Sequence, residues 1–298
     1  MNDLTMQIDR ESLNRFFGEA RFKVYVNYVI ANIDAVYASP DSYDVDSTEI
    51  LLIALELYRW NVKMSATIME YVAYIEVFVR NSIDLQLRSW LSKQTPVMMD
   101  DWIDAQHFMP INRIRRLLNG DGRDHLDEAR NAALRKQQLW RSDQSHPRHA
   151  DRVNRNDIFA QLTFGAWDGM LRQSGKDSEL AHVLMNAFPD IESAWSVEER
   201  RMKNARLPGN DSDLRIDRLR RELIDRLKSI RNVRNRAGHE ENLLYVEFPK
   251  VRRDMLFVLG ALGPKCIQLA LPDTAEPLRH ADPRQIIREL TNNTIQKG

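Results

Sequence analysis

Apolar residues recur at intervals of three and four along most of the chain, which is the spacing that places them on one face of an α-helix. The clearest case is Ser65–Leu91. Its apolar positions form one continuous stripe, made of Ile68, Val72, Ile75, Val79 and Ile83. Strand-like alternation is rare, and glycine and proline, which interrupt helices, number only 11 each. The pattern therefore predicts an all-α protein.

Helices are also predicted before this segment. Residues 10–37 have the apolar spacing of one or two helices. Residues 44–62 lead from a polar start into an apolar run, and Asp46 stands three residues before Glu49, which is the arrangement of a capping box. We therefore expect a further helix to begin here, upstream of Ser65–Leu91.

The C-terminal half is predicted to hold helices of different lengths. They are expected at residues 177–188, 191–204, 214–236 and 283–290. A compact turn is expected before them, at residues 158–171. Pro249 suits the first turn of another helix, because proline lacks the N–H that such a position leaves unused.

Residues 92–156 break the helical pattern. They contain three prolines, Gly120 and Gly122, and a long charged connection. We interpret them as an insertion or lid with irregular ends and low local stability. The chain from about residue 272 is polar and carries prolines, so we expect a polar C-terminal tail over residues 272–298. The prediction is one domain over residues 1–298 that includes this insertion and this tail.

The composition is that of a soluble globular protein. Of the 298 residues, 43% are hydrophobic and 29% are charged, which excludes a disordered chain and allows a large core. Lys+Arg and Asp+Glu both total 43, so the net charge is zero. The whole chain therefore has no general attraction to nucleic acid, and any site for a polyanion must come from local clustering.

The sequence also predicts a cytoplasmic protein. The single cysteine, Cys266, cannot form an internal disulfide, and its apolar neighbours favour a packing role over a nucleophilic one. The N-terminal segment has neither the basic start nor the apolar core of a signal peptide. The longest apolar run, Met255–Gly263, is too short to span a membrane.

Arg234 occupies an unusual place on the predicted helix at residues 214–236. At 100° per residue, five apolar residues of this helix fall within about 80° of one another: Ile216, Leu219, Leu223, Leu227 and Ile230. Arg234 falls inside that stripe. A guanidinium pointing toward a core or a partner needs an anion. The sequence leaves two alternatives for this anion: an internal carboxylate such as Glu76, or the phosphate of a ligand.

His239 follows five residues later. If the helix continued, the imidazole would lie about 140° away from Arg234 around the helix axis. Gly238 lies between them, and a change of direction at this glycine would return His239 toward Arg234. The alternative is an ordinary histidine at the end of a helix.

The order of these residues resembles a known motif. Residues 233–241, with the sequence VRNRAGHEE, place an arginine, a polar residue and then, after three more residues, a histidine: Arg234, Asn235 and His239. This resembles the signature of the HEPN superfamily. Two more segments resemble its Abi-like (abortive infection) branch: YVAYIEVFVRNSIDLQL at Tyr71–Leu87 and LTFGAWDGML at Leu162–Leu171. The three matches follow the family's order and cover residues 50–245 in outline, but the basic, histidine-bearing stretch before Phe164 does not align.

The resemblance implies a HEPN-type helical bundle that forms a homodimer and cleaves RNA without a metal or a cofactor. His239 would exchange protons with the 2′-OH or the leaving 5′-oxygen, since imidazoles titrate near neutral pH. Arg234 would bind the phosphate, and Asn235 would orient one of these groups. The expected products are a 2′,3′-cyclic phosphate and a 5′-hydroxyl. The implied setting is bacterial antiphage defence, with an antitoxin or another defence-system protein as a partner.

Four further residues are assigned around this centre. Glu76 and Arg80, which lie one turn apart on the helix of Tyr71–Leu87, are expected to support it. Their simpler interpretation is an ion pair within one helix. Arg231 and Arg236 flank Arg234 and are predicted to contact RNA. From a different class of function, the alternative for the whole chain is a non-catalytic helical module that binds RNA or a protein.

Other candidate sites have simpler explanations. His146, His149 and Asp151 could suggest a metal site, but they follow a loop and lack a fourth ligand, so a solvated surface is expected. The basic residues around Trp140 suit either an RNA backbone or a surface of mixed charge. The tryptophans, such as Trp167, are expected in the core.

Overall fold

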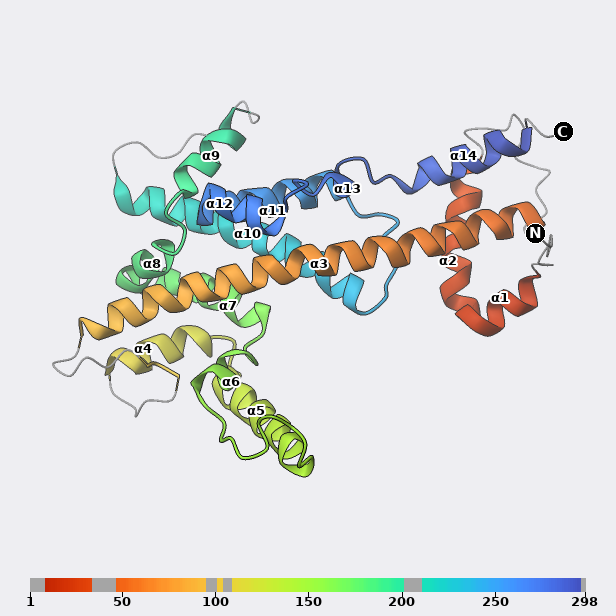
Figure 1. Cartoon of the computed structure of the whole chain (residues 1–298). Coiled ribbons are helices and arrows are strands. Elements are labelled where there is room, and N and C mark those ends of the chain that lie inside the picture. Colours follow the sequence, from red (N-terminus) through yellow and green to blue (C-terminus); the bar gives the residue numbers. More distant parts are fainter. Residues whose placement is uncertain (1–8, 34–46, 95–100, 104–108, 201–210, 296–298) are drawn as a thin grey trace. The chain divides into compact units, whose positions relative to one another are not determined.

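The computed structural model describes residues 9–33, 47–94, 101–103, 109–200 and 211–295 (Figure 1). Of these residues, 78% are helical, and no strand occurs among them. The predicted all-α class is therefore confirmed. The helices are α1 (Arg10–Phe17), α2 (Glu19–Ile33), α3 (Thr48–Ser92), α4 (Met109–Leu118), α5 (His125–Ser142), α6 (Arg155–Phe159), α7 (Phe164–Gln173), α8 (Ser178–Met185), α9 (Ile191–Glu199), α10 (Ser212–Gly238), α11 (Phe248–Leu262), α12 (Pro264–Ala270), α13 (Glu276–Arg279) and α14 (Pro283–Ile295), with a 3₁₀ turn at Ser174–Lys176.

The chain divides into two compact units. Unit 1 comprises Met1–Tyr71, Asn232–Arg252 and Ala275–Gly298. Unit 2 comprises Val72–Arg231 and Arg253–Thr274. Three of the four borders fall inside helices, in α3, α10 and α11, and the fourth lies in the connection between α12 and α13. Whether the units act as the single domain expected from the sequence stays a prediction.

Helix α3 contains 45 residues, and Figure 1 shows it as one uninterrupted ribbon. The expectation of two helices at residues 44–62 and 65–91 was therefore wrong. The helix continues because no glycine or proline occurs between Thr48 and Ser92. Its N-terminus is capped by the hydroxyl of Ser47, which accepts a hydrogen bond from the Ile50 amide at 3.4 Å. The predicted capping residue, Asp46, lies outside the described residues.

Unit 1 has a core built from α1, α2, the first half of α3 and α14. Helices α1 and α2 are separated at Gly18, whose φ of 80° suits a residue without a side chain. Phe22 of α2 and Leu57 of α3 are fully buried in this core, and Ile287 of α14 joins them. The C-terminal segment expected to be a polar tail thus contributes a buried side chain to unit 1.

Unit 2 buries a cluster of aromatic side chains. Trp102 lies edge-on to Trp167, with ring centroids 6.1 Å apart, and both are fully buried. The indole N–H of Trp102 donates to Asp84 at 2.8 Å. Helix α4 packs against α7, and α5 against α6. The segment expected to be an insertion therefore contributes Trp102, Ile111 and Ile114 to the core of this unit.

The compact turn expected at residues 158–171 was wrong, because most of this segment is helical. Asn154 caps α6 through a reciprocal capping box with Asp157. Helix α7 then begins at Phe164 and buries one face, which includes Trp167. Trp167 is thus a core residue, as predicted.

The buried stripe of α10 agrees with the spacing seen in the sequence. Leu219, Leu223, Leu227 and Ile230 are buried, whereas Arg218 and Lys228 are exposed. Pro249 lies in the first turn of α11, as predicted. Cys266 is half-buried in α12, and burial raises the pKa of its thiol, which disfavours the thiolate.

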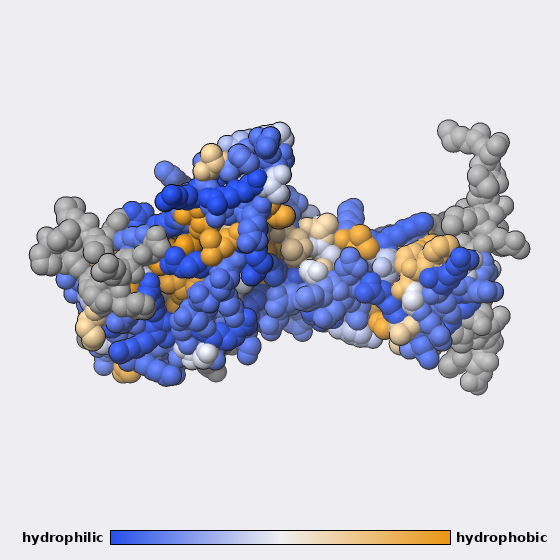
Figure 2. Space-filling view, turned by 90° about the horizontal axis from the view of Figure 1, so that it is seen from below, coloured by the Kyte–Doolittle hydropathy of each residue, from blue (hydrophilic) through white to orange (hydrophobic). Residues whose placement is uncertain are grey.

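The face drawn in Figure 2 is mostly hydrophilic, with apolar residues gathered in separate patches. Among the described helices, none is both long enough and apolar enough to cross a bilayer. Exposed apolar side chains on unit 1 include Val62, Met69 and Tyr245.

Candidate functional site

The segment that carries the Arg-Asn-x3-His motif closes α10 with a defined C-cap. The His239 amide donates to the Asn235 carbonyl at 3.0 Å, which continues the helical bonding one residue beyond Gly238. The Glu240 amide then donates to Ala237, and the Glu241 amide to Arg236 at 2.9 Å. This pair of bonds, with Glu240 at a φ of 54°, forms a Schellman motif.

The change of direction predicted at Gly238 is therefore absent. The left-handed residue that ends the helix is Glu240, which follows His239. Arg234 and His239 of one copy consequently lie about 140° apart around the helix axis. Gly238 is instead a helical residue beside Met69, whose sulfur would lie 3.8 Å from a Cβ added there.

Asn61 of α3 fixes the loop that follows the motif. Its side-chain oxygen accepts a hydrogen bond from the Leu243 amide at 2.7 Å, and its side-chain nitrogen donates to the Glu241 carbonyl at 3.3 Å. Asn61 is only 3% exposed, so these bonds are shielded from water. We did not identify this residue from the sequence, although an asparagine spaced four residues after Leu57 lies in an otherwise apolar stripe.

Charged side chains hold the same loop. The guanidinium of Arg236 donates to the Asn242 carbonyl, and its Nε lies 3.6 Å from a Glu241 carboxylate oxygen. Arg21 of α2 donates to Glu240 at 3.2 Å. These contacts give Arg236 a structural role at the end of α10. Its predicted contact with RNA stays a prediction.

Arg234 has a different environment. It is partly buried, and its Nη1 lies 3.3 Å from the side-chain oxygen of Asn235. Within the described residues of unit 1, no carboxylate forms an ion pair with Arg234. The guanidinium thus contacts a neutral amide, and no described carboxylate of this unit compensates its positive charge.

The remaining motif residue, His239, has an exposed side chain at the end of α10. The loop beyond it presents Tyr245, which is 71% exposed and lies edge-on to Tyr28 at 5.3 Å. Asn235 is also exposed. A solvent-facing imidazole at a fixed helix end can exchange protons with a ligand.

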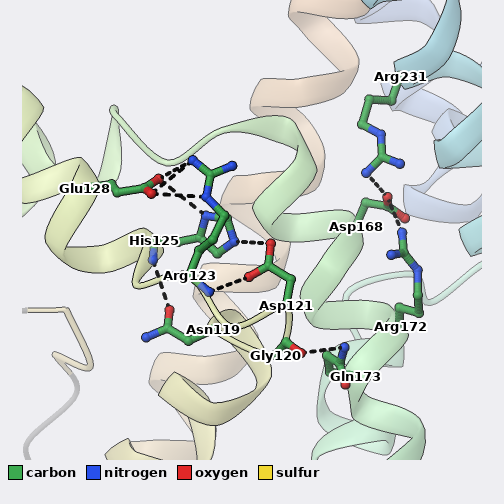
Figure 3. Close-up of polar contacts among 10 residues, drawn as sticks. All are labelled: Asn119, Gly120, Asp121, Arg123, His125, Glu128, Asp168, Arg172, Gln173 and Arg231. Atoms are coloured by element: carbon green, nitrogen blue, oxygen red, sulfur yellow. Dashed lines mark hydrogen bonds and ion pairs between the residues drawn. The ribbon is translucent and has the colours of Figure 1, made fainter.

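Arg231, two residues before the motif of α10, contacts another of the sequence motifs inside unit 2. Its guanidinium forms an ion pair with Asp168 of α7, which lies in the FGAWDGML segment (Figure 3). Asp168 is 0% exposed and also accepts a bond from Arg172 at 2.7 Å. A buried carboxylate requires such partners. Arg231 therefore stabilises unit 2, and its predicted RNA contact stays a prediction.

The two residues expected to support the site, Glu76 and Arg80, lie in unit 2, whereas Arg234 and His239 lie in unit 1. The guanidinium of Arg80 lies over the ring of Phe159, 5.4 Å from its centroid. Its Nε is buried and has no hydrogen-bond partner among the residues that the structure describes. A supporting role of Glu76 and Arg80 toward Arg234 stays a prediction.

The histidine-bearing loop after α5 is held by an arginine. Arg148 stacks on Trp140 at 3.9 Å from the ring centroid and bonds to Asp157 at 2.6 Å and to Asp151 at 2.9 Å. His146 stacks on the same indole. In the described part of the chain, no three histidine, cysteine or acidic residues are grouped as metal ligands would be. These contacts favour a mixed-charge surface over a base-stacking platform at Trp140.

No family model, no curated protein and no solved structure matches this chain. The interpretation of the site therefore depends on the ordered sequence motifs and on the geometry at the end of α10.

Proposed function

We propose that this protein is a metal-independent endoribonuclease that acts as a homodimer, with the motif at the end of α10 in its active site. The observation that supports this best is the state of Arg234. Its side chain is partly buried, contacts the Asn235 amide, and has no carboxylate partner within the described part of unit 1. An arginine held in this way suits an anion supplied by a ligand.

The scissile phosphodiester provides such an anion. The planar guanidinium of Arg234 binds two phosphate oxygens and stabilises the extra negative charge of the pentacoordinate transition state. Asn235 keeps the guanidinium in place and offers an amide N–H to a third oxygen. RNA supplies its own nucleophile, the 2′-OH, so the enzyme needs only to stabilise charge and to move protons.

We assign both proton transfers to His239. Because Arg234 and His239 of one copy point in different directions, the proposed active site combines Arg234 of one copy with His239 of the partner copy. A neutral imidazole accepts the proton of the 2′-OH as that oxygen attacks phosphorus. An imidazolium returns a proton to the departing 5′-oxygen. The products are a 2′,3′-cyclic phosphate and a 5′-hydroxyl end.

The proposed fold is a HEPN-type bundle, and the proposed setting is an abortive-infection or toxin system of the bacterial cytoplasm. A partner that holds such a nuclease inactive, an antitoxin for example, belongs to the same proposal. The motif order Tyr71–Leu87, Leu162–Leu171 and Val233–Glu241 supports it.

Cleavage of total RNA in the presence of EDTA tests the activity. We expect the wild-type protein to cut RNA and to leave 5′-hydroxyl ends that a polynucleotide kinase labels without prior phosphatase treatment. The His239→Ala and Arg234→Ala variants are expected to lose about 100-fold or more of this activity. Absence of cleavage by a folded wild-type protein, with added Mg²⁺ or without it, would contradict the proposal.

Mixing the two inactive variants tests the composite site. A heterodimer of Arg234→Ala with His239→Ala contains one intact site if each site takes one residue from each copy. Co-refolding equal amounts is then expected to restore about a quarter of the wild-type rate, since half of the dimers carry one of two sites. If both residues act within one copy, no activity returns.

One observation favours the second candidate, a non-catalytic RNA-binding or protein-interaction module. The Schellman motif holds Arg234 and His239 of a single copy apart. If the protein is a monomer in solution, binding of RNA without cleavage becomes the better interpretation. Sedimentation analysis of the purified protein distinguishes the two.

A further inference from the structure

A tyrosine is exposed on the loop that follows the Arg-Asn-x3-His motif. Tyr245 is 71% exposed, and among the described residues its ring contacts one other aromatic ring, that of Tyr28 of α2, edge-on at 5.3 Å. Tyr28 is buried, so it holds the Tyr245 ring against unit 1 while most of that ring stays open to solvent. Single exposed aromatic residues are common, so the surroundings of Tyr245 decide its role.

The backbone around Tyr245 is fixed by hydrogen bonds and burial. The preceding Leu243 is fully buried, and its amide donates to the Asn61 side chain at 2.7 Å. The Val246 amide donates to the Leu243 carbonyl at 3.0 Å and closes a turn around Tyr245. Phe248, which begins α11, is also fully buried. An exposed ring on such a loop loses little freedom when a planar ligand stacks on it.

Charged side chains at the start of α14 lie beside the two tyrosines. Helix α14 packs against α2 within unit 1 (Figure 1). Burial raises the pKa of the Tyr28 hydroxyl, the charge of Asp282 raises it further, and the charge of Arg284 lowers it. Both charged groups therefore lie close to Tyr28, which in turn contacts the ring of Tyr245.

This cluster contains more positive than negative groups. Arg284 binds both oxygens of Asp282, each at 2.9 Å, and so neutralises that carboxylate. These hydrogen bonds lower the pKa of Asp282, and the charge of Arg288 lowers it further. Arg288 follows one turn after Arg284 on the same face of α14. It is exposed and forms no ion pair among the described residues, so the cluster keeps a net positive charge that attracts an anion.

The acidic residues of the loop oppose this attraction only in part. Glu240 pairs with Arg21, and the Glu241 carboxylate lies 3.6 Å from Nε of Arg236. Glu247, two residues after the exposed tyrosine, is itself exposed and forms no ion pair in the described part of the chain. Glu247 is therefore the acidic side chain expected to repel a polyanion at this place.

We propose that Tyr245 and Arg288 form a subsite for single-stranded RNA. The ring of Tyr245 stacks on an unpaired base, and Arg288 binds a phosphate beside that base. Stacking on an aromatic ring next to a cation holds single strands with little preference for sequence. A base inside a duplex has no free face, so the subsite requires an unpaired strand.

The subsite lies near the proposed active site in the chain. Tyr245 follows His239 by six residues, so their Cα atoms lie at most about 20 Å apart, within the reach of a few nucleotides. The inference rests on the proposed ribonuclease and names its substrate as an unpaired strand. Its test measures binding by the His239→Ala variant, which is expected not to cut, so that loss of binding and loss of cleavage are observed separately.

Fluorescence anisotropy of a labelled RNA decamer without secondary structure measures this binding. Adding Tyr245→Ala to the His239→Ala protein is expected to weaken binding about tenfold, because one stacking side chain is removed. Tyr245→Phe is expected to keep the affinity within about twofold, since the ring stacks and the hydroxyl does not. Phe16→Ala is the matched control, because Phe16 is another aromatic residue of unit 1 and is 77% exposed. Equal affinities of the Tyr245→Ala and Phe16→Ala proteins would overturn the assignment.

A decamer that contains 2-aminopurine reports the stacking itself. Its fluorescence is expected to fall on binding to the protein that carries Tyr245 and to change much less with Tyr245→Ala. A merely structural role of Tyr245 would weaken binding without changing the fluorescence of the bound base. That result would exclude the stacking contact.

The phosphate contact is tested by the dependence of binding on salt. Arg288→Ala is expected to reduce the slope of log K against log salt concentration by about 0.7, the share of one phosphate on a single strand. Lys23→Ala, an exposed position of α2 about 140° around the helix from Tyr28, should leave the slope unchanged. Glu247→Gln should strengthen binding about twofold, because a repulsive charge is removed. An unchanged slope in Arg288→Ala would exclude the phosphate contact.

Two further results separate this inference from the proposed ribonuclease activity. A duplex of the same sequence is expected to bind at least about tenfold more weakly than the single strand, and equal binding would overturn the subsite. If the wild-type protein cuts total RNA but Tyr245→Ala does not weaken binding of the decamer, the subsite is wrong and the ribonuclease remains. If the decamer binds through Tyr245 but the wild-type protein cuts no RNA, binding remains and the ribonuclease is wrong.

Discussion

Arg226 and Arg234 both lie on α10, but their surroundings differ in charge. Arg226 is 6% exposed and is surrounded by three carboxylates: Glu222 at 2.6 Å, Asp254 at 3.1 Å and Glu198 at 3.5 Å. Arg234 contacts only the neutral amide of Asn235 among the described residues of its unit.

This difference separates a structural arginine from a candidate functional one. Burial alone would lower the pKa of Arg226, but its hydrogen bond to Glu222 and the charges of Asp254 and Glu198 raise it. The guanidinium is thus needed where it is, because it neutralises acids that could not otherwise be buried. Arg234 neutralises no carboxylate among the described residues of its own unit, which agrees with the proposed binding of an anion.

The largest effect is expected at Arg226. The Arg226→Ala substitution should lower the free energy of unfolding by about 3–5 kcal/mol, because it leaves three carboxylates in a buried site without their cation. Urea denaturation of this variant, compared with Lys228→Ala on the exposed face of the same helix, measures the loss. A change no larger than that of Lys228→Ala would show that Arg226 is not a structural residue.

A substitution of Asn61 tests whether the loop after α10 depends on the hydrogen bonds of the Asn61 side chain. Asn61→Ala leaves the buried Leu243 amide without an acceptor, so we expect a loss of about 1–3 kcal/mol in the free energy of unfolding. The hydrogen-exchange rate of the Leu243 amide should rise in the same variant. Asn235→Ala, at an exposed position of α10, is the control for stability. An unchanged exchange rate at Leu243 would show that Asn61 does not hold this loop.

The ion pair between Arg113 and Asp177 leads to a prediction on how the stability of the protein depends on pH. Arg113 binds both oxygens of Asp177, at 2.7 and 2.9 Å, and these bonds hold the pKa of Asp177 below its ordinary value. The stability that Asp177 contributes is therefore complete above its ordinary pKa and is lost as the pH falls through the lowered one.

Asp177→Asn should consequently cost about 1–2 kcal/mol at pH 7, because it removes the charge that pairs with Arg113 and keeps an acceptor for the cap of α8. The difference between this variant and the wild type is expected to shrink below about pH 4. Thermal unfolding at a series of pH values measures it. A difference that grows on acidification would contradict the assigned role.

The smallest effect on stability is expected at Arg234. Arg234→Ala should change the free energy of unfolding by less than about 0.5 kcal/mol, because no buried partner is left behind. Arg236→Ala should cost more, since Arg236 bonds to the Asn242 carbonyl. If Arg234→Ala destabilises the protein as strongly as Arg226→Ala, then Arg234 is a structural residue and the ribonuclease proposal loses its main support.

The helical character of the chain could be predicted from residue spacing, but the partners of the charged residues could not. The rotation of 100° per residue, which places Arg234 in the apolar stripe of α10, also places Arg226 within about 20° of Leu219. Spacing along one helix shows that a charge is buried. It does not show that Asp254 and Glu198, distant in the sequence, provide the compensating charges.

The end of α10 could not be predicted from the backbone preferences of its residues alone. Glycine adopts left-handed backbone conformations most readily, so Gly238 was the expected site of the change of direction. The structure uses Glu240 instead, a position at which a side chain costs about 1–2 kcal/mol. Contacts from Arg21 to Glu240 and from Asn61 to the Glu241 carbonyl offset this cost. Such tertiary contacts cannot be read from the motif alone.

The unbroken helix α3 also limits how this protein can be divided. Residues 71 and 72 belong to different compact units, yet they are consecutive in one helix. A gene fragment that ended at this border would leave a severed helix end with unsatisfied carbonyl groups. Neither unit can therefore be moved into another protein as a separate domain unless α3, α10 and α11 are all rebuilt.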